Sequence, residues 1–277
     1  MEEKLLERYL ELDSKGVRPK NVWYIDSPKG REYIKPAIPF VGKNYAQQKL
    51  GRKVLLYASA ENLVGYGPSI VELVKDSGMT RCRDFFNGSN EFFPNIHIQP
   101  INDGGLLVAA YQILKRFVGE WFSEEYGEMS PRDFLECVCC ANYGKFSLHS
   151  EDGKNVDYGN RAGMDVLEAC HEYIRADIEV LKPDIIILPA GIYHAAKQKE
   201  FLLDVAEGKD IKFIPIYQIN ARVVNCVMYP AMMKNKYGTI FTYDMLSENE
   251  LKWHEGVKRI NKDKFLSIYP YISSLNI

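Results

Sequence analysis

Short apolar runs and longer amphipathic stretches alternate along the chain. Val54–Tyr57 follows a charged, glycine-containing turn, and Asp184–Leu188 is ended by Pro189. Apolar runs of this length between turn residues are typical of strands buried on both faces. We therefore predict two strands here and three more at Cys137–Ala141, Ile211–Gln218 and Arg222–Met228.

The stretches between these runs have helical spacing. Residues 1–16 repeat leucine and tyrosine at helical intervals and end at Gly16. Gly163–Leu181 carries one apolar face, and Pro183 stops it because proline cannot continue a helix. Further helices are predicted at Leu106–Phe122, His194–Glu207 and 247–265.

This order of elements predicts the fold class. Strands that alternate with helices indicate an α/β protein with a mainly parallel sheet and helices on both faces. We expect a single domain over residues 1–277. Within it, residues 1–51 form an N-terminal helix and arm packed on the core.

Composition narrows the class of protein. A hydrophobic content of 46% with 26% charged residues is ordinary for a globular protein. No apolar run reaches the roughly 18 residues of a membrane span, and the N-terminus lacks a signal-peptide core. We expect a cytoplasmic protein that does not bind membranes. The net charge of −2 supplies no global field for nucleic acid, although it leaves a local basic groove open.

The six cysteines lie inside or beside apolar runs. Cys137 and Cys140 have the C-x-x-C spacing, but no second such pair exists, and neighbouring residues of a strand point to opposite faces. We predict reduced, buried thiols, with no metal and no cofactor. The chain also lacks the glycine-rich dinucleotide and P-loop motifs and the G-x-S-x-G of serine hydrolases.

The loop expected after the first strand is the first place to look for a site. Ala58–Asn62 is predicted to follow that strand directly, and it contains Ser59, Glu61 and Asn62. Ligands of open α/β sheets bind outside the carboxyl ends of the strands. These polar residues are therefore candidates for binding or catalysis.

Two further groups suit a planar ligand. Asn142 directly follows a predicted strand, and its carboxamide has the donors and acceptor needed to read a pyrimidine edge. Phe85 and Phe86 offer a surface on which a base can stack. The alternative for Asn142 is a turn with Gly144, and for the phenylalanines an anchor between loop and core.

Four segments in order resemble the uracil-DNA glycosylase superfamily. The first is the strand and loop 53–62, where that family carries its first motif. The second is 139–145, Cys-Cys-Ala-Asn-Tyr-Gly-Lys, which is similar to the family's strand ending in asparagine and followed by lysine. The third is the helix, proline turn and apolar strand of 175–191. The fourth is 227–231, Val-Met-Tyr-Pro-Ala, in the place of His-Pro-Ser.

The resemblance implies a three-layer α/β/α sandwich with a short, mainly parallel central sheet. Active members flip a base out of nucleic acid and hydrolyse its N-glycosidic bond. By this resemblance Asn142 reads the base and an aromatic residue stacks on it. Glu61 would activate water, and the Tyr229 hydroxyl would donate to a base carbonyl.

The motifs also depart from the family pattern. Ser59 or Ala60 stands where the first motif has its polar residue, and Glu61 and Asn62 come one or two positions later. Tyr229 replaces the histidine of His-Pro-Ser. Three hypotheses stay open: a divergent glycosylase-like protein that binds a nucleobase or nucleic acid, an enzyme acting on a small nucleoside-like molecule, and a non-catalytic module on the same fold.

Overall fold

The computed structural model describes residues 1–27, 30–47, 50–60, 78–80, 82, 134–150, 153 and 166–216. They form an α/β fold around a five-stranded sheet with the order β3-β5-β4-β6-β7. The strands are β3 (Phe40–Val41), β4 (Val54–Ala60), β5 (Cys139–Gly144), β6 (Ile185–Pro189) and β7 (Lys212–Ile216). All neighbours pair in parallel except β3, which pairs antiparallel with β5. The mainly parallel sheet predicted from the sequence is confirmed.

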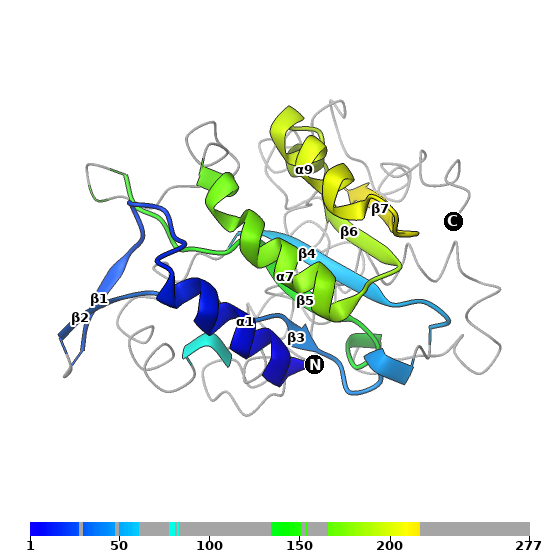
Figure 1. Cartoon of the computed structure of the whole chain (residues 1–277), viewed down its shortest axis with the longest axis horizontal. Helices are drawn as coiled ribbons and strands as arrows, with labels where there is room; N and C mark the ends of the chain where they lie inside the picture. Colours follow the sequence, from blue (N-terminus) through cyan, green and yellow to red (C-terminus); the bar gives the residue numbers. More distant parts are fainter. Residues whose placement is uncertain are drawn as a thin grey trace, which may run out of the picture.

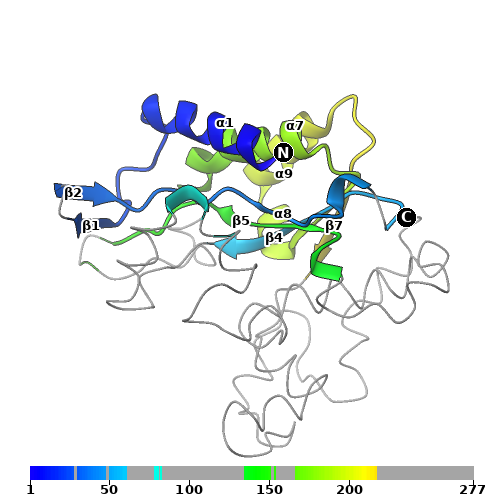
Figure 2. The ribbon, with the colours of Figure 1, turned by 90° about the horizontal axis from the view of Figure 1, so that it is seen from below.

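Helices cover one face of this sheet (Figures 1 and 2). They are α1 (Glu2–Ser14), α7 (His171–Leu181) and α9 (Ala196–Ala206), with the short α8 (Ala190–Tyr193) after β6. Single 3-10 turns lie at η1 (Tyr45–Gln47), η3 (Gly78–Thr80) and η5 (Leu167–Cys170). Within the described residues, no helix is long and apolar enough to cross a membrane. The described residues do not test the second helix layer of the predicted sandwich.

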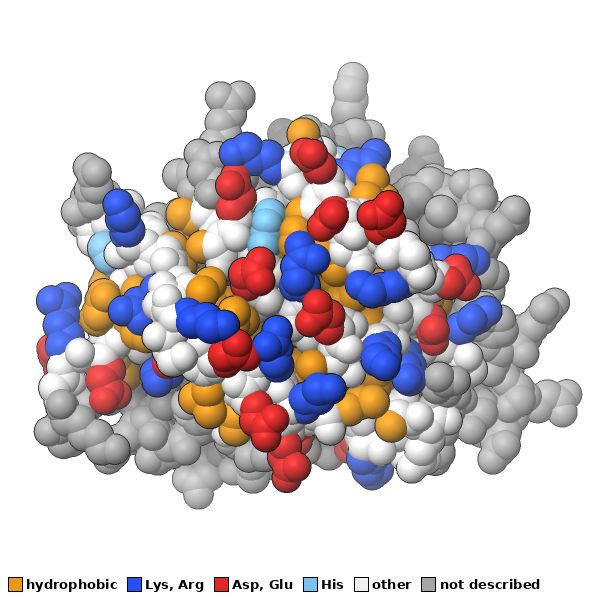
Figure 3. All heavy atoms as spheres, viewed as in Figure 1, with side chains coloured by type: hydrophobic (Ala, Val, Ile, Leu, Met, Phe, Trp, Pro, Cys, Tyr) orange, Lys and Arg blue, Asp and Glu red, His pale blue; other side chains and the backbone are white. Residues whose placement is uncertain are grey.

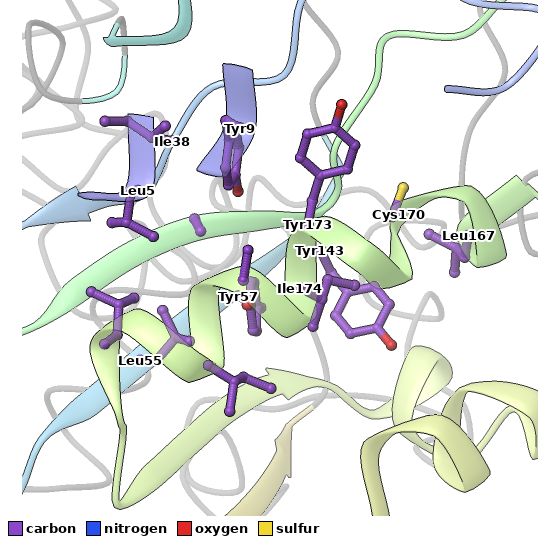
Figure 4. Close-up of a cluster of buried hydrophobic side chains, with 14 of the residues drawn as sticks. Leu5, Tyr9, Ile38, Leu55, Tyr57, Tyr143, Leu167, Cys170, Tyr173 and Ile174 are labelled. Atoms are coloured by element: carbon purple, nitrogen blue, oxygen red, sulfur yellow. The ribbon is translucent and has the colours of Figure 1, made fainter. Parts of the chain in front are cut away.

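Strand alternation sorts the sheet's side chains between its two faces. Leu55 and Tyr57 of β4 belong to the core beneath α1 and α7 (Figure 4). Ile186 of β6 belongs to the same core. Their neighbours Leu56 and Ile187 point the other way and are also buried. Both faces are therefore interior, which explains why these strands appear in the sequence as continuous apolar runs.

Two predicted strand ends are wrong. The chain does not leave the sheet at Tyr57, because β4 continues to Ala60 through pairing of Ala60 with Gly144. Likewise β5 begins at Cys139 and continues past Asn142, so Asn142 lies within the strand. Small residues carry no apolar signal, yet their backbones pair as well as any others. Ladder hydrogen bonds therefore extended both strands beyond their hydrophobic runs.

The predicted helices and the other described strands agree more closely. The helix before Pro183 occurs as η5 followed by α7, and α7 ends at Leu181 with Lys182 in the left-handed conformation. The strand predicted at Asp184–Leu188 is β6, shifted by one residue. The predictions at 106–122, 222–228 and 247–265 fall outside the described residues.

The N-terminal arm folds into a hairpin of two short strands, β1 (Tyr24–Ser27) and β2 (Gly30–Tyr33). Gly30 has a φ of +114°, a conformation that residues with a side chain rarely adopt, so glycine suits this turn. Just before the hairpin, the backbone N–H of Trp23 donates to the Ser147 carbonyl, and the backbone N–H of His149 donates to the Asn21 carbonyl. These bonds fasten the arm to the segment that follows β5.

Candidate functional site

The carboxyl ends of β4 and β5 meet at one edge of the sheet because the two strands are parallel. Ala58 stands opposite Asn142 in their register. Asn142 is the one partly exposed residue of β5, and the strand's other side chains are buried. Within the described part of the chain, no group hydrogen bonds its carboxamide. The strand thus presents an unpaired carboxamide in the region where α/β sheets bind ligands.

The pleat separates the two predicted site residues that the structure describes. Ser59 follows Tyr57 by two positions and lies on the helix-covered side of β4. Asn142 alternates with Ala141 and Tyr143, which belong to the helix-covered core, so its side chain projects to the opposite face. Asn142 and Ser59 therefore do not form one side-chain surface. The predicted residues Glu61, Asn62, Phe85, Phe86 and Tyr229 lie outside the described residues.

A buried polar cluster occupies the helix-covered face near this edge. The Asp177 carboxylate of α7 accepts hydrogen bonds from the Tyr9 hydroxyl at 2.7 Å and from the Tyr57 hydroxyl at 2.8 Å. The Lys145 ammonium lies 2.5 Å from Asp177 Oδ2. Lys145 and Asp177 are almost completely inaccessible to solvent, at 1% and 0% exposure. We call Tyr9, Tyr57, Lys145 and Asp177 the Asp177 cluster.

The Asp177 cluster has a structural role, because its groups are occupied with one another. Burial above all, and then the charge of Asp177, raises the pKa of both tyrosines well above the ordinary value, so they remain donors. The Lys145 ammonium also lies 5.2 Å from the centre of the Tyr57 ring. This lysine follows Asn142 as in the glycosylase pattern, but its ion pair directs it into the core, away from the Asn142 face.

Sequence reasoning missed the Asp177 cluster, although one signal was present. Asp177 lies one turn after Tyr173, within the buried stripe of α7 that includes Ile174 and Ile178. A carboxylate in an apolar stripe needs a buried partner, because an unpaired buried charge is costly. Nothing in the sequence, however, indicated which tyrosines and which lysine would supply the partners.

A second polar group joins α7 to α9 at the same edge. The Tyr143 hydroxyl donates to Gln198 Oε1 at 2.8 Å, and His171 Nε2 lies 2.9 Å from the same oxygen. A carbonyl oxygen can only accept, so His171 Nε2 carries a hydrogen. The His171 ring stacks on Phe201 with the ring centres 3.7 Å apart. His171 is thereby held in a defined, half-buried position.

His171 should make the fold sensitive to acid. Burial lowers the pKa of its imidazole below the ordinary value, against the opposing effects of Gln198 and Glu168. As pH falls from about 7 to about 5, the unfolded chain takes up the proton first, so stability should decline across that window. Urea unfolding at several pH values should show a shallower decline for His171→Gln. Equal slopes in the parent chain and in His171→Gln would contradict the assignment.

The described residues offer no group of three or more metal-ligating side chains. Cys137, Cys139, Cys140 and Cys170 are buried thiols that form no disulfide, and Cys82 is partly exposed. Burial raises the pKa of the Cys139 thiol well above its ordinary value, which makes it a poor nucleophile and ligand. The prediction of buried thiols is therefore confirmed for these four cysteines.

No protein-family model and no curated protein matches the chain. The functional argument therefore depends on the residues of the sheet edge.

Proposed function

We propose that this chain is a divergent uracil-DNA glycosylase-like protein that binds a nucleobase through Asn142. The observation that carries the proposal is the partly exposed Asn142 carboxamide, which no described residue hydrogen bonds, in a strand whose other residues are buried. Its amide presents a donor and an acceptor side by side, and the imide edge of uracil presents the complementary pair. Ala58, its register partner on β4, adds only a methyl group beside it.

The catalytic part of the proposal rests on the sequence resemblance. Glu61 follows β4 by one residue, where a carboxylate would activate water for attack on the N-glycosidic bond. The Tyr229 hydroxyl would donate to a carbonyl of the departing base, and Phe85 or Phe86 would stack on its ring. The Asp177 cluster and the apolar strands would hold Asn142 in place.

Oligonucleotides containing uracil, hypoxanthine or xanthine test the proposal directly. The purified protein should bind at least one of them in preference to a matched strand that carries adenine at the same position. Asn142→Ala should remove that preference, with at least about tenfold weaker binding, because it removes both hydrogen bonds to the base. Asn142→Asp, which keeps the shape but not the donor, should also lose the preference.

Strand cleavage after alkali treatment separates the three hypotheses. Cleavage that depends on Glu61 would identify a glycosylase, and binding without cleavage would identify a non-catalytic reader. Hydrolysis of free nucleosides alone would identify an enzyme acting on small molecules. Absence of binding at low salt, or an unchanged Asn142→Ala variant, would contradict nucleobase recognition.

A further inference from the structure

The hairpin of β1 and β2 forms a second distinctive surface. It lies at one end of the molecule, apart from the five-stranded sheet (Figures 1 and 2). Its strands are antiparallel, with Tyr24 opposite Tyr33 and Asp26 opposite Arg31. Residues directly opposite each other in such a pair project from the same side. These four side chains therefore share one face of the hairpin.

Cations and aromatic rings are stacked along this face. The Arg31 guanidinium lies 5.1 Å from the centre of the Tyr24 ring, and the Arg18 guanidinium lies 4.5 Å from that of Tyr33. The two tyrosine rings meet edge to face, with centres 6.4 Å apart. We call Arg18, Tyr24, Arg31 and Tyr33 the Tyr–Arg face. In Figure 3, basic and hydrophobic side chains lie next to one another at this end of the molecule.

The carboxylates near the Tyr–Arg face leave Arg31 available. Asp13 is occupied, because it accepts from the Tyr33 hydroxyl, pairs with Lys35 at 2.9 Å and lies 3.9 Å from Arg18. Asp26 is the register partner of Arg31, yet the guanidinium lies over Tyr24. Among the described residues, no carboxylate is within ion-pairing distance of Arg31.

We propose that the Tyr–Arg face binds single-stranded nucleic acid. Nucleotides combine a flat base with an anionic phosphate. An exposed tyrosine beside a guanidinium that pairs with no carboxylate of the described residues matches both groups. Tyr24 is 39% exposed. This inference rests on the proposed function. It adds a contact for the strand, independent of base identity, at a distance from the residue that reads the base.

The same type of contact elsewhere on the chain supplies a matched control. The Lys199 ammonium lies 5.9 Å from the centre of the Tyr193 ring, on an exposed position of α9. Arg31→Glu and Lys199→Glu change the net charge equally. A difference between them would therefore report the location of the binding surface and not the overall charge.

Fluorescence anisotropy with a labelled oligothymidine of about 20 nucleotides tests the inference. At low salt, Arg31→Glu should bind at least about tenfold more weakly than the parent chain, and Lys199→Glu within about twofold of it. Tyr24→Ala should weaken binding, and Tyr24→Phe, which retains the ring, should not. Circular dichroism establishes that each variant is folded. If Arg31→Glu is not folded, the milder Arg31→Gln replaces it.

Four results would overturn the inference. The first two are no binding of oligothymidine by the parent chain and unchanged binding by the hairpin variants. The other two are equal weakening by Arg31→Glu and Lys199→Glu, and equally effective displacement by polyglutamate, which would assign the face to acidic polypeptides. Asn142→Ala is tested separately, for loss of the preference for the modified base. If the hairpin variants keep their oligothymidine affinity and Asn142→Ala loses its preference for the modified base, only the role of the hairpin is rejected. If the hairpin variants lose affinity and Asn142→Ala keeps its preference, only base reading by Asn142 is rejected.

Discussion

Asp177→Ala should lower the free energy of unfolding by about 3–5 kcal/mol, because it leaves the Lys145 ammonium buried without its counter-ion. Both tyrosine hydroxyls would also lose their acceptor. Urea unfolding monitored by circular dichroism measures the change. The matched control is Asp204→Ala, which breaks the exposed ion pair with Arg175 and should cost no more than about 1 kcal/mol.

Removal of both charges tests the same explanation from the other side. Lys145→Met combined with Asp177→Leu leaves no unpaired ion, so the double variant should recover part of the stability lost by Asp177→Ala. Equal stability of Asp177→Ala and Asp204→Ala would show that the Asp177 cluster does not act as a buried ion pair.

Gly42→Ala should destabilise the fold by about 1–3 kcal/mol, because the new methyl group collides with backbone atoms. A Cβ at this position would lie 2.7 Å from the Leu135 carbonyl oxygen and closer still to the Glu136 carbonyl. The Gly42 N–H donates to the Val138 carbonyl at 3.0 Å, so the two backbones are fixed against each other. Thermal and urea unfolding both report the loss.

Gly191→Ala is the control for this substitution. Gly191 lies in α8, and a Cβ there meets no atom within 4 Å. Alanine favours helix over glycine, so this variant should be as stable as the parent chain or slightly more stable. Equal effects at the two positions would show that the Gly42 contact relaxes at little cost.

The sequence predicted the described elements well wherever local hydrophobicity determined them. The apolar runs of β4 and β6 and the apolar stripe of α7 can be recognised in the sequence, because strands and helices each bury side chains at a characteristic spacing. The ends of β4 and β5 could not be predicted, because Ala58–Ala60 and Asn142–Gly144 are held in the sheet by backbone pairing with each other. A run of small and polar residues after an apolar run looks like a loop until its partner strand is known.

The candidate site was less accessible to sequence reasoning for the same reason. Asn142 was found because its amide chemistry is evident from residue type. As a loop residue, Ser59 was a plausible neighbour of Asn142. In a strand, however, each side chain projects from a fixed face, and Ser59 and Asn142 project from opposite faces. The Asp177 cluster depends on contacts between residues up to 168 positions apart, and no local pattern encodes them.

The long separations within the Asp177 cluster also constrain how the chain folds during synthesis. Tyr57 emerges 120 residues before Asp177, which at about 5–20 residues per second is a wait of about 6–24 s. Until then the central strand lacks β6, and α1 lacks the helix against which it packs. During synthesis, α1 and β4 therefore expose apolar surface until α7 and β6 are available. We expect chaperone dependence during translation to be greatest before α7 leaves the ribosome.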